Sequence, residues 1–578
     1  MTILPIPAIR LRSVSRRPLL AVALVLTGLA LPASSARSGA GVALSVRAAD
    51  HDWPMHGRDA GETRYSPLDR IHTGNVGGLS VAWSWTIPKS GARIETTPIV
   101  VDGVMYATGP LSFVFALDAG TGTRIWQWDP GIRDAQDGGP RACCGNVNRG
   151  VALHEGRVYA GLLDGRLVAL NAQDGAVVWQ VQTTPQNSDY TITGAPRIVA
   201  GNVIIGNGGA EYGVRGYVTA YDAATGRQVW RTYTVPGDPA LGFENDGMRE
   251  AAATWTGEWW KTGGGGTAWD GMAWDADANL LYVGTGNGSP WNRDHRSPGG
   301  GDNLYLSSIL ALHPADGRIV WYYQTTPGDN WDYTATQPLL LLDVTMGGRD
   351  RNVIVQAPKN GFFYVLDRRT GELISARQYA DDVTWATGID HVTGRPIETS
   401  LARYSEHRDG AFISPGPTGA HNWYPMAWSR TTGLVYLPAQ NTSYLYRKSD
   451  RFEYRPGSWN TGTGGSGGSP PGRPAMKGPP TMLLAWDPAA NREVWRVAGN
   501  GGHGGTLATA GNLVFWASGS QLLAVDARSG EQLWSAQVGR GPATPITYAI
   551  GGRQYVTIAA GLGGADPPRV WTFALPPG

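Results

Sequence analysis

One short phrase recurs along the chain and constrains its fold more than any other feature. The phrase has an aspartate or a substitute at a turn, a glycine four residues later and a tryptophan four residues after that. Aspartate opens the turn, glycine adopts a positive φ, and an alternating apolar strand follows, so each copy predicts two strands joined by a tight turn. In chain order, the copies start at Asp118, Asn171, Asp222, His313, Asp367 (which lacks the tryptophan), Asp487 (which has asparagine for glycine) and Asp526.

The spacing of the copies predicts the architecture. Neighbouring copies are 53, 51 and 54 residues apart where the spacing is regular, and another strand precedes many of them. A unit of about four strands that repeats in this way is typical of a β-propeller. The repeat therefore predicts an all-β propeller of four-stranded blades, with the tryptophans packed between neighbouring blades.

Two longer gaps decide the number of blades. The third and fourth copies are 91 residues apart, and the fifth and sixth are 120 apart. Each gap leaves room for a blade that has lost the phrase, and the segments around Asp275 and at residues 428–441 fit that interpretation. With two of the nine phrases or fragments assigned to one blade, we expect eight blades within residues 50–578. The segment 446–480, rich in Gly, Pro and Ser, is expected to be a long exposed loop.

Composition agrees with a turn-rich β protein and excludes several other classes. Glycine accounts for 81 of 578 residues, twice the usual share of about 7%, and 24 residues are tryptophan. A hydrophobic content of 42% argues against disorder. The formal net charge of +1 gives no electrostatic indication of nucleic-acid binding. Two cysteines are too few for a disulfide framework or a cysteine-rich zinc site.

The N-terminus is typical of an export signal. Four arginines between residues 10 and 17 precede an uncharged apolar run at residues 18–32, and small residues follow. We expect residues 1–49 to be a signal peptide and linker cleaved near residue 36 or 49, and the mature chain to be periplasmic. An uncleaved anchor is the alternative, since the run is shorter than the roughly 20 residues of a membrane helix. No other segment is apolar enough to span a membrane.

The two cysteines, Cys143 and Cys144, are neighbours in the sequence. A disulfide between adjacent residues is strained, because their Cα atoms are only about 3.8 Å apart. Two buried thiols and a redox switch are the alternatives. An oxidising compartment favours the disulfide.

Polar residues at predicted strand ends form the other candidate site. Glu211 lies in GGAEYGVRG and Asn287 in GTGNGSPWN, and the segment DNWDYT adds Asp329 and Asp332. Carboxylate and amide oxygens are hard ligands that suit calcium. For each of these residues taken alone, the alternative to a metal ligand is a side chain that only caps a turn.

From about residue 50 to the C-terminus, the chain resembles the pyrroloquinoline quinone (PQQ)-dependent alcohol dehydrogenases, the family of the methanol and ethanol dehydrogenase large subunits. The resemblance rests on motifs in the family's order: ETTPIVVDGVMYA, CCGNVNRG, TITGAP, GGAEYGVRGYVTAYD, GGGTAWDGMAWD, GTGNGSPWN, GDNWDY, APKNGFFYVLDR and GAHNWYPMAW. It implies an eight-bladed propeller that oxidises primary or secondary alcohols by hydride transfer to PQQ.

The resemblance also implies a role for each matching residue. Cys143 and Cys144 would form a vicinal disulfide against one face of PQQ, and Trp269 would stack on the other face. Glu211, Asn287 and Asp332 would bind the metal, and Asp332 would be the general base. The other implied cofactor-binding residues are Glu95, Arg149, Thr193, Gly209, Ala210, Thr267, Lys359 and Asn422.

Departures from the family pattern refine these expectations. Lanthanide-using members have a second aspartate two residues after the base, where this chain has Thr334, so we expect calcium. His503 and Ala565 replace residues that lie near the cofactor in relatives, which suggests a different and roomier pocket. No CxxCH haem motif is present, so electrons are expected to leave on a separate soluble cytochrome c.

Two other functions stay open at this point. One is a PQQ dehydrogenase that acts on sugars or other polyols, and the other is a non-catalytic propeller scaffold of the cell envelope. Whether the chain is a monomer or a homodimer is also open.

Overall fold

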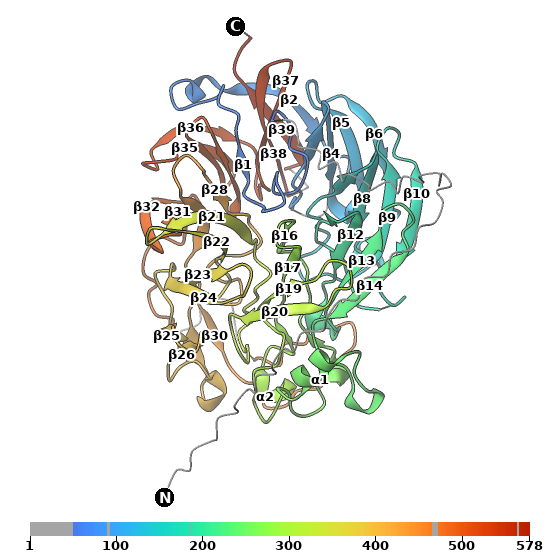
Figure 1. Ribbon diagram of the computed structural model, residues 1–578, viewed down its shortest axis with the longest axis vertical. Coiled ribbons are helices and arrows are strands. Elements are labelled where there is room, and N and C mark those ends of the chain that lie inside the picture. Colours follow the sequence, from blue (N-terminus) through green and yellow to red (C-terminus); the bar gives the residue numbers. More distant parts are fainter. Residues whose placement is uncertain (1–49, 90–92, 187, 465–471, 563–565, 578) are drawn as a thin grey trace, which may run out of the picture. The chain divides into compact units, whose positions relative to one another are not determined.

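The computed structural model describes residues 50–89, 93–186, 188–464, 472–562 and 566–577. These residues contain eight blade sheets, each with four antiparallel strands, and one of them is extended by a fifth, parallel strand. The sheets follow one another as the blades of a propeller (Figure 1). The expected eight-bladed fold is confirmed. The expected signal peptide at residues 1–49 lies outside the described residues.

The first four blades are meanders of consecutive segments. Blade 1 is β3 (Ile99–Val101), β4 (Val104–Thr108), β5 (Val114–Asp118) and β6 (Arg124–Trp128). Blade 2 is β7 (Ala152–His154), β8 (Arg157–Gly161), β9 (Arg166–Asn171) and β10 (Val177–Gln182). Blade 3 is β11 (Arg197–Val199), β12 (Asn202–Gly206), β13 (Tyr217–Asp222) and β14 (Gln228–Tyr233). Blade 4 is β16 (Met272–Asp275), β17 (Leu280–Gly284), β19 (Ser308–Leu312) and β20 (Ile319–Gln324).

The last four blades include the one that closes the ring. Blade 5 is β21 (Leu340–Met346), β22 (Arg349–Gln356), β23 (Phe362–Asp367) and β24 (Leu373–Gln378). Blade 6 is β28 (Ala427–Trp428), β29 (Val435–Gln440), β31 (Thr481–Asp487) and β32 (Arg492–Ala498). Blade 7 is β33 (His503–Thr509), β34 (Leu513–Ser518), β35 (Gln521–Asp526) and β36 (Gln532–Gln537), with β1 (Tyr65–Ser66) parallel to β33. Blade 8 is β37 (Ile546–Ile550), β38 (Arg553–Ala560), β39 (Arg569–Ala574) and the N-terminal β2 (Ser80–Thr86).

Short elements fill the connections between blade strands. Three two-stranded sheets pair β15 (Gly264–Gly265) with β18 (Gly288–Ser289), β25 (Ala386–Ile389) with β26 (Pro396–Glu398), and β27 (Ala411–Ile413) with β30 (Tyr444–Tyr446). The helices are α1 (Asp246–Ala252) and α2 (Arg293–Arg296), together with short 3-10 turns that include η3 (Ala135–Asp137) and η4 (Ala210–Tyr212). Within the described part of the chain, no helix has the length and apolar character of a membrane span.

The repeated phrase acts as a docking device between blades. The indole Nε1 of Trp179 donates a hydrogen bond to the carbonyl of Ala223 in the next blade, at 3.0 Å. A Cβ atom on the phrase glycine of that blade, Gly226, would lie 2.8 Å from the same indole. This position therefore favours glycine for two reasons: its φ is +73°, and the indole approaches too closely for a side chain. The same contact recurs in the pairs Trp83–Gly122, Trp126–Gly175, Trp230–Gly317, Trp321–Gly371 and Trp495–Gly530. The predicted packing of these tryptophans between blades is confirmed.

The assignment of phrases to blades needs a correction. Asp275 and the copy at His313 both belong to blade 4, and residues 428–441 share blade 6 with the copy at Asp487. The long gaps therefore hold insertions within and between blades, and no extra blades. The blade without a phrase is blade 8, because the phrase marks the turn into the outermost strand. In blade 8 that strand is β2, which comes from the other end of the chain.

The meander sorts the loops onto two faces of the propeller. In blades 1 to 7, the turns after the first and third strands lie on one face. The loop after the second strand and the connection to the next blade lie on the other. The insertions at residues 234–271, 285–307 and 379–426, and the described parts of 441–480 (residues 441–464 and 472–480), all belong to the second face. This concentration of long loops is where a propeller builds a site.

The segment just before β1 runs across the first face and ties several blades together. Carbonyl groups of Ala60, Gly61 and Thr63 each accept a backbone hydrogen bond at 2.9 Å, from blades 4, 5 and 6 in turn. A buried cluster anchors this segment: Glu62 lies 2.7 Å from His56 and 2.8 Å from Arg197 of blade 3. Burial alone would raise the pKa of Glu62, but Arg197 and His56 lower it to about 2.

Candidate active site

A cavity of about 300 Å³ on the second face collects almost all of the predicted site residues. They reach it from connections between blades and from the loops after second strands, which explains how positions far apart in sequence converge. The predicted residues that line it are Cys143, Cys144, Arg149, Thr193, Gly209, Ala210, Glu211, Thr267, Trp269, Asn287, Asp332, Lys359 and Asn422.

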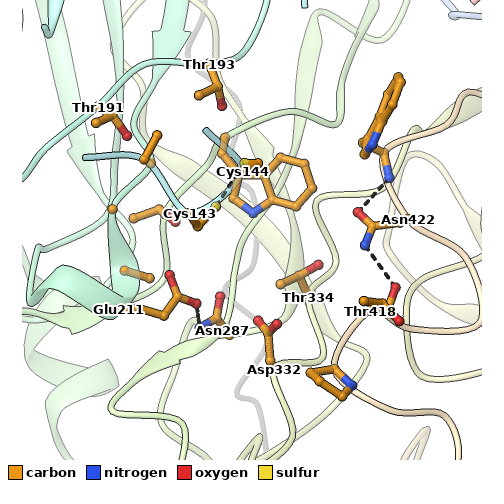
Figure 2. A pocket seen from close by; sticks show the side chains of 18 of the residues that line it. Cys143, Cys144, Thr191, Thr193, Glu211, Asn287, Asp332, Thr334, Thr418 and Asn422 are labelled. Carbon is orange, nitrogen blue, oxygen red and sulfur yellow. Dashed lines mark hydrogen bonds between the residues drawn. The ribbon is translucent and has the colours of Figure 1, made fainter. Parts of the chain in front are cut away.

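Two of the predicted metal ligands are in direct contact. Glu211 lies in the 3-10 turn η4 between β12 and β13, and Asn287 lies in the loop after β17. The Nδ2 group of Asn287 donates to Oε1 of Glu211 at 2.9 Å, and the indole of Trp291 donates to the same oxygen at 3.0 Å. Figure 2 shows Glu211, Asn287 and Asp332 gathered on one side of the pocket, below the two cysteines.

Asp332 lies in the connection from blade 4 to blade 5 and has an unusual backbone. Its φ is +65°, a conformation that non-glycine residues rarely adopt and that often marks functional positions. The side chain is buried, and Nζ of Lys359 donates to its Oδ2 at 2.9 Å. Burial raises the pKa of Asp332 well above its usual value, while Lys359 opposes the rise.

Asp329, three residues earlier, has a structural role. Its Oδ1 accepts backbone hydrogen bonds from Trp331 at 3.1 Å and Tyr333 at 2.9 Å. The turn-capping alternative therefore holds for Asp329, and the cap fixes the loop that presents Asp332.

Arg149 is the centre of a buried charge cluster at one end of the cavity. Its guanidinium lies 2.7 Å from Glu95, 3.6 Å from Asp270 and 4.9 Å from the ring centre of Trp269. It also donates to the hydroxyl of Thr193 at 2.7 Å. Among the predicted cofactor-binding residues, Glu95 is the one that does not line the cavity. It contacts Arg149, which does. Burial alone would lower the pKa of Arg149, but Glu95 and Asp270 raise it, so the cation is permanent.

The two cysteines lie in the loop between η3 and β7. Their sulfur atoms are 2.9 Å apart, which is longer than the roughly 2.05 Å of a disulfide bond, so the structure contains two thiols in contact. The hydrogen bond to Cys144 raises the pKa of Cys143, and the same bond, with Arg149 nearby, lowers the pKa of Cys144 to about 7. The vicinal disulfide stays a prediction.

Close backbone packing fixes the position of Trp269. A Cβ atom on Gly194, which follows Thr193, would lie 2.5 Å from the carbonyl oxygen of Trp269. The TITGAP motif thus needs its glycine because the Trp269 backbone passes directly over it. The indole faces the cavity from a firmly held loop.

The residues present fit calcium and PQQ, the two groups that the family resemblance implies. Two carboxylates and an amide in one pocket supply the hard oxygen ligands that calcium prefers. Three cations line the same cavity, Arg93, Arg149 and Lys359, and suit a ligand with several carboxylates. The Nε atom of Arg149 is buried with no hydrogen-bond partner among the described residues. An aromatic ring, Trp269, provides a stacking surface for a planar ligand.

Of the three residues at which the chain departs from the family pattern, His503 turns out differently from the expectation. His503 is buried against Tyr424 and Trp516, with ring centres 5.2 and 6.3 Å away, and does not line the cavity. Burial lowers the pKa of His503 to about 3, so it is a neutral packing residue behind the site. Thr334 does line the cavity, and Nε2 of Gln337 donates to its hydroxyl at 2.8 Å. Ala565 lies outside the described residues.

Sequence reasoning missed other residues that line the cavity. Trp291 and Trp423 stand inside the quoted motifs GTGNGSPWN and GAHNWYPMAW, so their motif context was a usable signal. Trp459 had no such signal, because it lies in the Gly/Pro-rich segment 446–480. Most described residues of that segment are exposed, yet Asn460 is buried and Trp459 reaches the cavity.

Comparisons with known proteins give one family of relatives. The family model described as "PQQ: Glucose/ethanol/alcohol dehydrogenase, beta-propeller domain" matches residues 53–378 and 484–556. The chain is 50% identical over 545 residues to quinohemoprotein alcohol dehydrogenase from Comamonas testosteroni, covering 91% of this chain and 76% of that protein. It is 46% identical over 553 residues to 1-butanol dehydrogenase (cytochrome c) from Thauera butanivorans, covering 91% and 78%.

Solved structures agree. The crystal structure of the Comamonas testosteroni enzyme has a TM-score of 0.86 at 49% identity and covers 92% of this chain and 81% of its own. A europium-containing methanol dehydrogenase has a TM-score of 0.82 at 31% identity and covers 91% of this chain and 98% of its own.

Proposed function

This chain belongs to the PQQ-dependent alcohol dehydrogenase family, and we propose that it oxidises primary alcohols to aldehydes with PQQ and calcium in the periplasm. The observation that carries this proposal is the convergence of Glu211, Asn287 and the Asp332–Lys359 pair in one cavity with Trp269. Secondary alcohols, which would give ketones, are a second substrate group compatible with the same chemistry.

The proposed cofactor site uses opposite parts of the cavity wall. Arg149 and Lys359 would bind the negative groups of PQQ, and Glu95 would hold Arg149 in place through their 2.7 Å contact. Trp269 would stack on one face of the ring system, and Cys143 and Cys144, as a vicinal disulfide, would cover the other. Thr193, Gly209, Ala210, Thr267 and Asn422 would complete the shell.

Glu211, Asn287 and Asp332 would hold calcium. Bound PQQ supplies a hydride acceptor, and bound calcium supplies a Lewis acid. Thr334 supports calcium over a lanthanide, since a threonine hydroxyl bonded to Gln337 adds no negative charge to the ligand set.

Asp332 would take the proton of the alcohol hydroxyl as general base. Lys359 holds the Asp332 carboxylate by its 2.9 Å hydrogen bond and keeps a positive charge beside the reacting atoms. Because both side chains are buried, this ion pair acts in a medium of low dielectric constant, where its field is stronger than in water.

A cytochrome c is the proposed electron acceptor. The only cysteines of this chain are adjacent, so the chain itself carries no CxxCH haem-attachment motif. Export through the N-terminal signal would bring the enzyme to the periplasm.

The test is reconstitution. The purified protein is incubated with PQQ and calcium, with PQQ and a lanthanide, or with either component alone, and alcohol-dependent dye reduction is measured. We expect activity only with PQQ and a metal, and more with calcium than with the lanthanide. Inactivity in every combination would contradict the proposal, and activity on glucose but on no simple alcohol would assign the enzyme to the sugar-oxidising class.

A further inference from the structure

We propose that Trp459 determines substrate specificity: together with Trp291, it binds the apolar chain of the alcohol and selects primary alcohols with a longer chain or an aromatic ring. This inference rests on the proposed function, which names the reaction but not the alcohol. It concerns the outer part of the cavity, beyond the cofactor and metal residues.

Trp459 lies where the cavity opens to solvent. It lines the cavity together with Glu211 and Asp332, yet 46% of its surface is exposed. In the described part of the chain, it is the only tryptophan among the exposed large hydrophobic residues. An indole left half in water at the mouth of a cavity offers apolar surface that a ligand can cover.

A continuous aromatic wall joins Trp459 to the metal ligands. Its ring lies edge-on to Trp291, with centres 6.2 Å apart and planes at 82°. Trp291 in turn donates its indole N–H to Glu211 at 3.0 Å. An alcohol whose hydroxyl group lies beside Asp332 would extend its carbon chain along these two indoles toward solvent.

The backbone holds Trp459 in place before any ligand arrives. The next residue, Asn460, donates its backbone N–H to the carbonyl of Glu211 at 2.9 Å. The Asn460 side chain closes its own loop by donating to the carbonyls of Arg455 at 3.0 Å and Ser458 at 2.6 Å. Nearby, the hydroxyl of Tyr454 donates to the carbonyl of Tyr212 at 2.8 Å. A wall that is ordered in advance loses little entropy when it binds a chain.

The chemistry of this wall favours one substrate class. Apart from their N–H groups, indole rings offer no partners for additional hydroxyl groups, so a sugar or polyol would lose hydrogen bonds to water on entry. Alkyl and phenyl groups gain by leaving water. The short chains of methanol and ethanol have little apolar surface to bury against this wall and would gain little from it.

The test compares alcohols of different length. The enzyme loaded with PQQ and calcium is assayed with ethanol, 1-butanol, 1-hexanol and benzyl alcohol as wild type, Trp459→Ala and Trp459→Phe. We expect Trp459→Ala to lower kcat/KM for 1-hexanol by about tenfold and for ethanol by less than about twofold. Trp459→Phe should retain most of the preference. Tyr322→Ala, which removes an aromatic residue of similar exposure (43%) from the outer strand β20, should change nothing.

A second readout separates this inference from the proposed function. Binding of 1-hexanol to the loaded Asp332→Asn protein is measured by calorimetry with and without Trp459→Ala. Weaker binding only in the double variant supports the role of Trp459, even if no alcohol is turned over. Wild-type inactivity on all alcohols contradicts the proposed function. An unchanged 1-hexanol to ethanol ratio, or unchanged 1-hexanol binding, overturns the inference about Trp459.

Discussion

Nζ of Lys359 lies 2.9 Å from Oδ2 of Asp332, and both side chains are buried. They come from neighbouring connections on one face: Asp332 joins blades 4 and 5, and Lys359 lies in the loop after the second strand of blade 5. The pair places a carboxylate that can accept a proton beside a fixed cation. In the proposed reaction, the carboxylate would accept the proton of the alcohol and the cation would stabilise the negative charge that develops beside it.

Glu62 should stabilise the fold above acid pH. Its folded pKa of about 2 is below the ordinary value of 4.5, so its contribution is full above pH 4.5 and is lost as the pH falls toward 2. That difference corresponds to about 3 kcal/mol. Glu62→Gln leaves the Arg197 guanidinium without its buried carboxylate partner and should cost about 3–5 kcal/mol at neutral pH.

Denaturant unfolding at several pH values measures this effect. The control is Glu244→Gln, which breaks the more exposed pair with Arg215 and should cost less than about 1 kcal/mol. Equal losses in the two variants would contradict the anchoring role of the buried cluster.

The tryptophan contacts between blades can be tested at two glycines. Gly226 and Gly201 have φ angles of +73° and +78°, but only at Gly226 would a Cβ atom meet a neighbour, the indole of Trp179. Alanine at either position pays about 1–2 kcal/mol for the left-handed backbone. Gly226→Ala should lose roughly another 1–3 kcal/mol through overpacking, seen as a lower midpoint of unfolding. Equal midpoints for the two variants would argue against the docking.

The state of Cys143 and Cys144 can be counted directly. We expect the exported protein to bind no thiol reagent in denaturant, and to bind two equivalents after reduction, measured by mass spectrometry. Two reactive thiols without reduction would leave the pair as the structure has it. In that case Cys144, with its pKa of about 7, should react faster than Cys143 at neutral pH.

Thr334 should set the choice of metal. It lines the cavity two residues after Asp332, so Thr334→Asp adds a third carboxylate to the pocket. We expect this variant to gain activity with a lanthanide and to lose at least part of its activity with calcium, because the extra charge favours a trivalent ion. The control is Thr418→Asp, which adds a carboxylate on another wall of the cavity and so tests charge alone. Lanthanide activity in Thr418→Asp as well would remove the specific role of Thr334.

Much of the fold was predictable from local sequence. The phrase from Asp118 to Trp126 and its copies specify turn, strand and inter-blade contact within nine residues, so each copy carries its own evidence. Blade closure was not predictable in this way. The pairing of β2 with β39 joins the two ends of the chain, and the local sequence of neither strand indicates its partner.

The site residues also divide into those that local motifs predicted and those that they did not. Glu211, Asn287 and Asp332 lie in motifs with polar residues where a core strand needs none, and the fold brings them together. Trp459 was not predictable from the sequence, because a Gly/Pro-rich segment has no periodicity that indicates which side chain turns inward. His503 shows the opposite error: its position in the sequence suggested the cofactor pocket, whereas the structure buries it behind Tyr424.

The most direct test of the account is the turnover of Asp332→Asn beside Asp329→Asn. Both proteins are loaded with PQQ and calcium, bound PQQ is quantified, and alcohol-dependent dye reduction is measured. We expect Asp332→Asn to keep PQQ and lose about 10²–10⁴-fold in turnover. Asp329→Asn should stay active, because an amide oxygen still accepts the backbone hydrogen bonds of the cap. Full turnover in Asp332→Asn would contradict the assignment of Asp332 as the base.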